Sequence, residues 1–191
     1  MKLFSTWQLP VGIGDFALRA DNVLSNSGKD FYRPDWMEGV EALPMLVVRI
    51  GKVAKCIEEQ FADRYYDRLS LAFSLRASRI DDNLPEAMRE NFDGSFVRWS
   101  QWVGYDDLVD RDRLSAVRMV TPQQLDTEVP LILPAKETIS KALVLVSRYY
   151  LLKIGDLIAL PAATVPISLE REQGLFMVGR DNEELIFLRI K

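Results

Sequence analysis

Hydrophobic and polar residues alternate along several stretches of the chain, and these stretches predict β-strands. The clearest is 69–75, where every odd position is large and apolar and the residues between are small or polar. This period of two is typical of a strand with one buried face. Further strands are predicted where aliphatic residues cluster beside turn residues, at 46–50, 157–160, 174–178 and 185–190.

Three other segments show the spacing of short amphipathic helices. The clearest is 138–150, where apolar side chains recur on one face and Lys141 and Arg148 lie on the other. A second helix is predicted at 57–65, and a third begins at the N-cap Asn83 and ends near Gly94. Strands therefore dominate, and the helices are too few for a doubly wound parallel sheet. The predicted fold class is α+β.

The composition fits one ordinary globular domain. The chain has 191 residues, of which 48% are hydrophobic and 27% are charged, so it is long enough to bury a substantial core. We expect a single domain over 1–191, with 1–20 as a loosely packed N-terminal segment.

The charge and the hydropathy of the chain limit which partners and which cellular compartment we expect. A net charge of -4 argues against a nucleic-acid or anionic-membrane partner, since phosphate binding needs concentrated Lys and Arg. The longest apolar run, 157–167, is interrupted by prolines and is too short to span a bilayer, and 1–11 lacks the hydrophobic block of a secretory signal. The single cysteine cannot form an internal disulfide, which suits a reducing compartment. We expect a cytoplasmic protein.

The chain contains no histidine, and Cys56 is its only cysteine. This excludes Ser-His and Cys-His pairs and every multi-cysteine metal site. Any chemistry must therefore use carboxylates, Lys, Arg, Tyr or Ser. Cys56 is either a nucleophile or a partly buried structural residue, and without a histidine to activate it we favour the second interpretation.

Three further groups of residues each allow a functional and a structural interpretation. An acidic cluster could hold Ca²⁺, but the spacing of an EF-hand is missing and a solvated loop is favoured. A group of arginines could bind an anion, although exposed or salt-bridged arginines are commoner. An aromatic group could line a pocket or a dimer interface, with core packing as the favoured alternative. The acidic cluster is Asp106, Asp107, Asp110 and Asp112. The arginines are Arg64, Arg68, Arg76 and Arg79. The aromatic group is Phe96, Trp99, Trp102 and Tyr105.

Four segments in order resemble the fumarylacetoacetate hydrolase family in its small single-domain form. They are Phe-Tyr-Arg-Pro-Asp at 31–35, the stretch 50–67, Phe-Asp-Gly-Ser at 92–95 and Leu-Lys-Ile-Gly-Asp-Leu-Ile at 152–158. The resemblance runs from about residue 19 to residue 191. It implies a mixed β-sandwich roll and a homodimer. It also implies hydrolysis, isomerisation or decarboxylation of small β-dicarbonyl acids such as acylpyruvates, with Mg²⁺, Mn²⁺ or Ca²⁺ at the site.

The resemblance also shows which site residues have changed. The family holds its metal with Glu-x-Glu on one strand and an Asp on a later strand, and these positions are Leu43, Met45 and Ser74 here. The position of the active-site lysine is Glu90. The Asn-Thr substrate clamp and the Thr-Gly-Thr-Pro loop correspond to residues beginning at Leu131 and Leu160, and the family's His-Glu pair has no counterpart.

These replacements lead us to expect no catalytic residue, no metal ligand and no cofactor. Substrate-binding residues stay open at the six positions Leu43, Met45, Ser74, Glu90, Leu131 and Leu160. We expect apolar side chains to fill the former cavity, each contributing about 1.5–3 kcal/mol if fully buried.

The predicted function is that of a catalytically degenerate relative with an interaction or ligand-binding role. Its partners would be a second copy of the chain, a small keto acid or an active paralogue. The alternative is an active hydrolase, isomerase or decarboxylase on a small β-dicarbonyl acid, working without the family's metal or with displaced ligands such as Glu41 or Glu38. A small-molecule sensor is a third interpretation.

Overall fold

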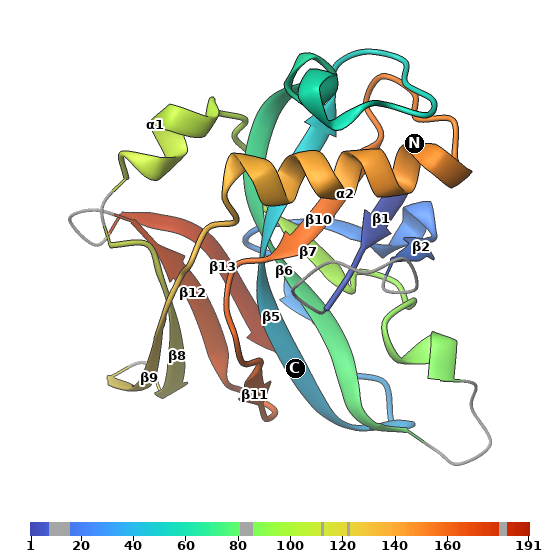
Figure 1. Cartoon of the computed structure of the whole chain (residues 1–191). Helices are drawn as coiled ribbons and strands as arrows, with labels where there is room; N and C mark the ends of the chain where they lie inside the picture. The colour runs from blue at the N-terminus through green and yellow to red at the C-terminus, as the bar shows by residue number, and fades with distance from the viewer. Residues whose placement is uncertain (8–15, 81–85, 112, 122, 180–182) are drawn as a thin grey trace.

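The chain folds into two β-sheets, with a long helix lying across the larger one (Figure 1). The computed structural model describes residues 1–7, 16–80, 86–111, 113–121, 123–179 and 183–191. Most strand pairs are antiparallel, and three are parallel: β1 with β10, β3 with β7, and β4 with β13. The architecture is thus the mixed, strand-dominated α+β fold that the sequence predicts.

The larger sheet is built around two long strands, β5 (Met37–Ile50) and β6 (Tyr66–Ile80), which pair antiparallel along their whole length. A third strand, β11 (Ile167–Leu169), also pairs with β5. From one edge to the other, the strands are β2 (Ala17–Arg19), β1 (Leu3–Ser5), β10 (Leu157–Pro161), β5, β6, β7 (Phe96–Arg98) and β3 (Leu24–Asn26).

The smaller sheet consists of two antiparallel hairpins side by side, with one parallel strand added at its edge. Its order is β4 (Asp30–Phe31), β13 (Glu184–Ile190), β12 (Gly174–Val178), β8 (Ser115–Thr121) and β9 (Gln124–Pro130). The strand β3 ends at Asn26 and β4 begins at Asp30, but the two belong to different sheets. This short connection therefore joins the two sheets.

Helices occupy the ends and one face of the sheets. The helix α2 (Lys136–Tyr149) buries Ile139, Ala142, Leu143 and Val146, the face expected from its spacing. The others are short: α1 (Tyr105–Val109) and the 3-10 turns η1 (Asp21–Val23), η2 (Glu59–Arg64) and η3 (Glu86–Arg89).

Both faces of the larger sheet are buried, each in a different hydrophobic cluster. Along β5, Val40, Leu46 and Val48 point into the first core cluster, which also contains the inner side of α2 and the smaller sheet. Leu43 and Met45 point the other way, into the second core cluster with Leu3, Val23, Val47, Ala72, Phe96, Leu157, Ala159 and Ala163. The metal-ligand positions inferred from the sequence therefore lie on the second face.

Several local predictions need correction. Residues 69–75 form a strand, but both of its faces are buried, because Ser70, Ala72 and Ser74 are as inaccessible as the apolar residues between them. The predicted helix at 57–65 is the shorter 3-10 turn η2, and its Phe61 is 37% exposed. The proposed N-cap Asn83 lies outside the described residues.

The described part of 1–20 packs more tightly than the sequence suggests. Leu3, Phe4 and Ser5 are at most 2% exposed, and β1 is hydrogen-bonded on both sides, to β10 and β2. This segment therefore forms part of the larger sheet, which differs from the loose packing that we expected.

Candidate functional site

The three positions inferred from the sequence to be metal ligands in the family are neighbours on one face of the larger sheet. Leu43 on β5 lies directly across from Ser74 on β6, and Met45 is two residues further along β5. Because side chains two apart on a strand point to the same side, all three face the second core cluster. Leu43 is 3% exposed, and Met45 and Ser74 are completely buried.

The guanidinium of Arg19 reaches this position from the edge of the sheet. Arg19 ends β2, and its Nη1 donates to the hydroxyls of Ser5 and Ser74 at 3.2 and 3.3 Å. Its Nη2 donates to Ser95 Oγ at 2.8 Å and to the main-chain carbonyl of Glu90. Nη1 also lies 3.5 Å from the Glu90 carboxylate. We call these five residues the Arg19 cluster.

The Arg19 cluster contains a fixed positive charge. Arg19 is only 3% exposed, and this burial lowers the pKa of its guanidinium to about 10, although the Glu90 carboxylate acts in the opposite direction. The group therefore stays protonated at neutral pH. Its Nε is buried with no hydrogen-bond partner in the described structure, whereas both terminal nitrogens have acceptors.

A second arginine lies beside the cluster and neutralises the nearest acid on β5. Glu41 is two residues before Leu43, and its carboxylate is 3.0 Å from the guanidinium of Arg76. The Arg76 guanidinium in turn lies 4.7 Å from the ring centre of Trp7. Glu41 is thus held by an arginine, which disfavours it as a displaced metal ligand.

Comparison with known proteins identifies this arrangement of sheets. By sequence, the chain matches no family model and no curated protein. Solved structures do match it. One is a protein assigned to the fumarylacetoacetate hydrolase family from Yersinia pestis CO92, with a TM-score of 0.75 over 100% of this chain and 92% of that one, at 16% identity. The chain has the fumarylacetoacetate hydrolase fold.

Two further solved structures have named activities. The 5-carboxymethyl-2-hydroxymuconate delta-isomerase of Mycobacterium smegmatis matches with a TM-score of 0.71 over 99% of this chain and 78% of that chain, at 12% identity. The fumarylpyruvate hydrolase of Pseudomonas aeruginosa, solved with Mn²⁺ and pyruvate, matches with a TM-score of 0.71 over 100% and 89%, at 12% identity. Likeness at this level establishes the fold, and the activity must be argued from the site.

The residues at the three positions that the resemblance assigns to metal ligands do not fit a divalent cation. Mg²⁺, Mn²⁺ and Ca²⁺ need several oxygen ligands, usually including carboxylates. Leu43 and Met45 offer no oxygen, and the Ser74 hydroxyl already accepts a hydrogen bond from the Arg19 guanidinium, whose charge would repel the ion. Across the described ranges, no group of three or more His, Cys, Asp or Glu side chains could hold a metal.

The remaining two positions inferred from the family do not converge on this site. Leu160 is fully buried in the first core cluster, on the opposite face of the sheet, because neighbouring residues of β10 alternate between faces. Leu131 is partly buried against the same first cluster. Of the six positions, only Leu43, Met45, Ser74 and Glu90 come together.

The acidic cluster at 106–112 is occupied by structural contacts. Asp106 forms an ion pair with Lys136 at 3.0 Å, and Asp107 accepts the backbone N–H of Gly104 at the start of α1. Asp112 lies outside the described residues. The interpretation as a solvated, structural segment is therefore the better supported one.

The other candidate residues divide between surface, core and cleft. Cys56 is exposed, so the expectation of a partly buried cysteine is wrong. Arg64 stacks on Phe61, with its guanidinium 4.8 Å from the ring centre. Phe96 and Trp99 are core residues, whereas Trp102 is half-buried and lines a cleft.

A helix that crosses a bilayer must be long and apolar. No helix in the described part of the chain combines the length and the apolar character that crossing a membrane demands.

Proposed function

We propose that this protein is a catalytically degenerate relative of the hydrolases and isomerases that share its fold, and that it acts by binding a ligand or a partner. The observation that carries the proposal is the position of Arg19. A buried guanidinium contacts Ser74, where the family pattern expects a metal-binding Asp, and Leu43 and Met45 fill the two Glu positions.

The chemistry of the Arg19 cluster supports loss of metal-dependent turnover. In metal-assisted enolate chemistry, a cation with open coordination positions must contact the substrate oxygens. Here the positive charge is held by three serine hydroxyls and by Glu90. This charge therefore serves the packing of the protein interior. The neighbouring side chains of Leu43 and Met45 offer no oxygen that could bind a metal ion.

The alternative of an active enzyme with displaced ligands has weaker support. Its best candidate, Glu41, is ion-paired with Arg76. Glu38 is exposed, and its carbonyl accepts a hydrogen bond from Arg33. No second carboxylate joins Glu41 to form a metal site in the part of the chain that the structure describes.

The proposal extends to assembly and location. We expect a cytoplasmic homodimer, with a small keto acid or an active paralogue as further partners. The exposed Cys56 thiol suits a reducing compartment. Val53, Leu151 and Ile154 lie around the bridge between Ala54 and Leu152 and are 56%, 46% and 70% exposed, which supports an interface at this end of the protein.

The test is Mn²⁺ binding by electron paramagnetic resonance together with acylpyruvate turnover in the presence and absence of EDTA. The Pseudomonas aeruginosa fumarylpyruvate hydrolase serves as the positive control. We expect neither tight Mn²⁺ binding nor turnover from the wild type. We expect the same of Arg19→Met, because removing the cation does not supply carboxylates. Turnover by the wild type that EDTA abolishes would contradict the proposal.

A further inference from the structure

A separate cleft opens on the same face of the larger sheet, away from the Arg19 cluster. Arg49 on β5 is four residues beyond Met45, which places it roughly 13 Å further along the strand. The cleft has a volume of about 550 Å³, within the range of small-molecule sites. It is lined by Met1, Leu24, Ser25, Asn26, Lys29, Arg49, Arg98, Trp102, Gly155 and Leu157.

The charged residues of this cleft are all basic. Arg49, Arg98 and Lys29 line it, and no Asp or Glu is among the lining residues. We call it the cationic cleft. The protein as a whole has a net charge of -4, so this concentration of positive charge runs against the average of the chain.

Only one of the three cations is neutralised by a carboxylate. Arg49 forms a two-pronged contact with Asp67, at 3.0 and 2.7 Å. Arg98 donates to the main-chain carbonyl of Trp99, which has no net charge. Within the described residues, neither Arg98 nor Lys29 has an ion-pair partner, so two positive charges face the cleft without a matching acid.

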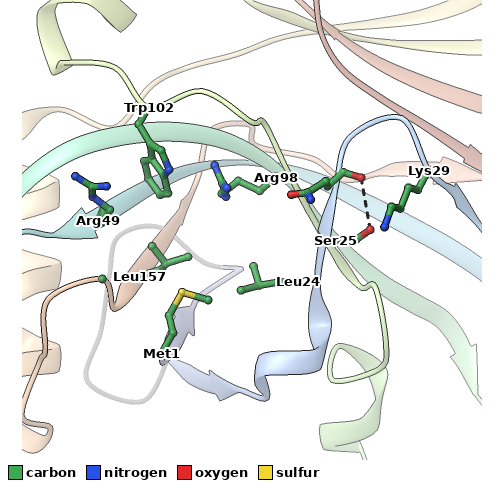
Figure 2. A pocket seen from close by; sticks show the side chains of 10 residues that line it. Met1, Leu24, Ser25, Lys29, Arg49, Arg98, Trp102 and Leu157 are labelled. Carbon is green, nitrogen blue, oxygen red and sulfur yellow. Dashed lines mark hydrogen bonds between the residues drawn. The ribbon is translucent and has the colours of Figure 1, made fainter.

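Trp102 holds the two arginines beside each other. The Arg98 and Arg49 guanidinium carbons lie 4.5 and 5.3 Å from the centre of its ring. Figure 2 shows the indole between the two arginine side chains, with Leu24, Leu157 and Met1 across the cleft. Attraction between the cations and the ring fixes the guanidinium groups before any ligand arrives.

The electrostatic surroundings of Arg98 favour the binding of an anion. Burial lowers the pKa of Arg98, and the nearby charge of Arg49 lowers it further. Two like charges kept this close are unfavourable in the absence of a counter-charge. An oxyanion bound to Arg98 would relieve this cost and would accept charge-assisted hydrogen bonds.

We propose that the cationic cleft binds a small organic anion that carries a carboxylate or a phosphate monoester on an apolar body. The charged group contacts Arg98 and Lys29, and the apolar body packs against Leu24 and Leu157. Ser25 and Asn26 supply neutral polar groups at the side of the cleft. The site contains none of the Arg19 cluster, so it stands independently of the proposed loss of metal chemistry.

The experiment is isothermal titration calorimetry at low ionic strength with phenyl phosphate, benzoate and inorganic phosphate. We expect saturable binding of at least one aromatic anion, stronger than that of inorganic phosphate, and weaker binding as salt is added. Binding of only phenyl phosphate or only benzoate would identify which oxyanion the cleft accepts. If neither aromatic anion binds, or if inorganic phosphate binds as tightly as both, the proposal fails.

Variants locate the binding. Arg98→Gln should weaken it by about tenfold or more, since a hydrogen bond to a charged group is lost. Lys29→Gln should also weaken binding of the anion. Because Lys29 is exposed, this variant should fold and keeps the test valid if Arg98→Gln does not fold. The matched control is Arg64→Gln, which removes an arginine that also stacks on an aromatic ring but lies outside the cleft. Equal weakening by Arg64→Gln would show that the effect is general charge and would overturn the site.

Discussion

Arg19 is the side chain on which the functional interpretation depends most. A buried charge is tolerated only when it is paired and hydrogen-bonded, and this guanidinium meets both conditions through Glu90 and three serines. With the adjacent ion pair of Glu41 and Arg76, the region contains two cations and two anions. Arg19, Glu90, Glu41 and Arg76 therefore form a charge-balanced group beside an apolar cluster.

Replacing Arg19 should cost considerable stability. In Arg19→Met the Glu90 carboxylate loses its ion pair, and three buried serine hydroxyls lose their donor. Removing one partner of a buried pair typically lowers the free energy of unfolding by about 3–5 kcal/mol, which urea denaturation would measure. The control is Arg64→Met at an exposed position, expected to change stability by less than about 0.5 kcal/mol. If the two variants proved equally stable, Arg19 would not be a buried structural charge.

The family resemblance predicts which positions differ, but it does not predict that Arg19 lies among them. The exchange of Lys for Glu90 indicated that a carboxylate would stand near a largely apolar cavity, and such a group needs a cation. The chain has many arginines, and those singled out by spacing lie elsewhere. Arg19 carries no local signal, because its partners are 14 to 76 residues away along the chain.

The strands β5 and β10 show how local breaks are accommodated within a buried sheet. Pro44 lies in the middle of β5 and has no N–H to donate. It falls where the partner of β5 changes from β11, which pairs up to Ala42, to β10, which pairs from Met45 onward. The Pro44 carbonyl still accepts a hydrogen bond from Ala162 at 2.8 Å.

The turn before β10 is fastened to the N-terminal strand by Asp156. Its carboxylate accepts the backbone N–H groups of Lys2 and Lys153, both at 2.8 Å, and forms an ion pair with the Lys2 ammonium. Burial alone would raise the pKa of Asp156, but these contacts outweigh it and the pKa is lowered. Gly155, at φ +85°, permits the tight turn that presents this carboxylate.

Protonation of Asp156 at low pH should weaken its contacts with Lys2 and Lys153. Because the pKa of Asp156 is lower in the folded state, its contribution is present above the unfolded pKa near 3.9 and is lost as pH falls through the folded value. Asp156→Asn should lower stability by about 1.5–3 kcal/mol at neutral pH, and the difference from wild type should shrink as the carboxylate becomes protonated. Urea denaturation over a pH series would measure this. The control is Asp126→Asn at an exposed position, which should change stability little. If Asp156→Asn lowered the free energy of unfolding by the same amount at every pH, the Asp156 carboxylate would not have the role described.

The predictions of helices and strands were confirmed where the periodicity is strong. They failed where contacts between distant segments determine the local structure. The pattern at 174–178 matches β12, and 138–150 falls within two residues of α2. The segment 57–65 became a 3-10 turn because only part of its apolar face is buried. Strands β1, β2 and β7 are three residues long, too short for any pattern, and exist because neighbouring strands pair with them.

Across the protein, burial of both faces of the larger sheet sets the pattern of stability. β5 and β6 lie at its centre with partners on both sides, whereas β9 ends the described part of the smaller sheet and mostly faces solvent. Local opening is cheapest where buried contacts are few. The two core clusters should therefore protect the central strands most strongly.

Hydrogen exchange measured by mass spectrometry tests this order. We expect the slowest exchange in peptides covering β5 and β6, and the fastest exchange among the strands in β9. The adjoining β8, which is paired on both sides, is the internal control. Exchange in β9 as slow as in β5 would mean that another surface covers β9 in solution.

The amino-acid order was enough to indicate a strand-rich α+β chain and the absence of histidine chemistry, because these follow from short-range periodicity and residue type. The identity of the cation beside Ser74, and the gathering of Arg49, Arg98 and Lys29 around Trp102, depend on strand register. Register brings together residues that no spacing along the chain relates, and it is set by the burial of both sheet faces at once.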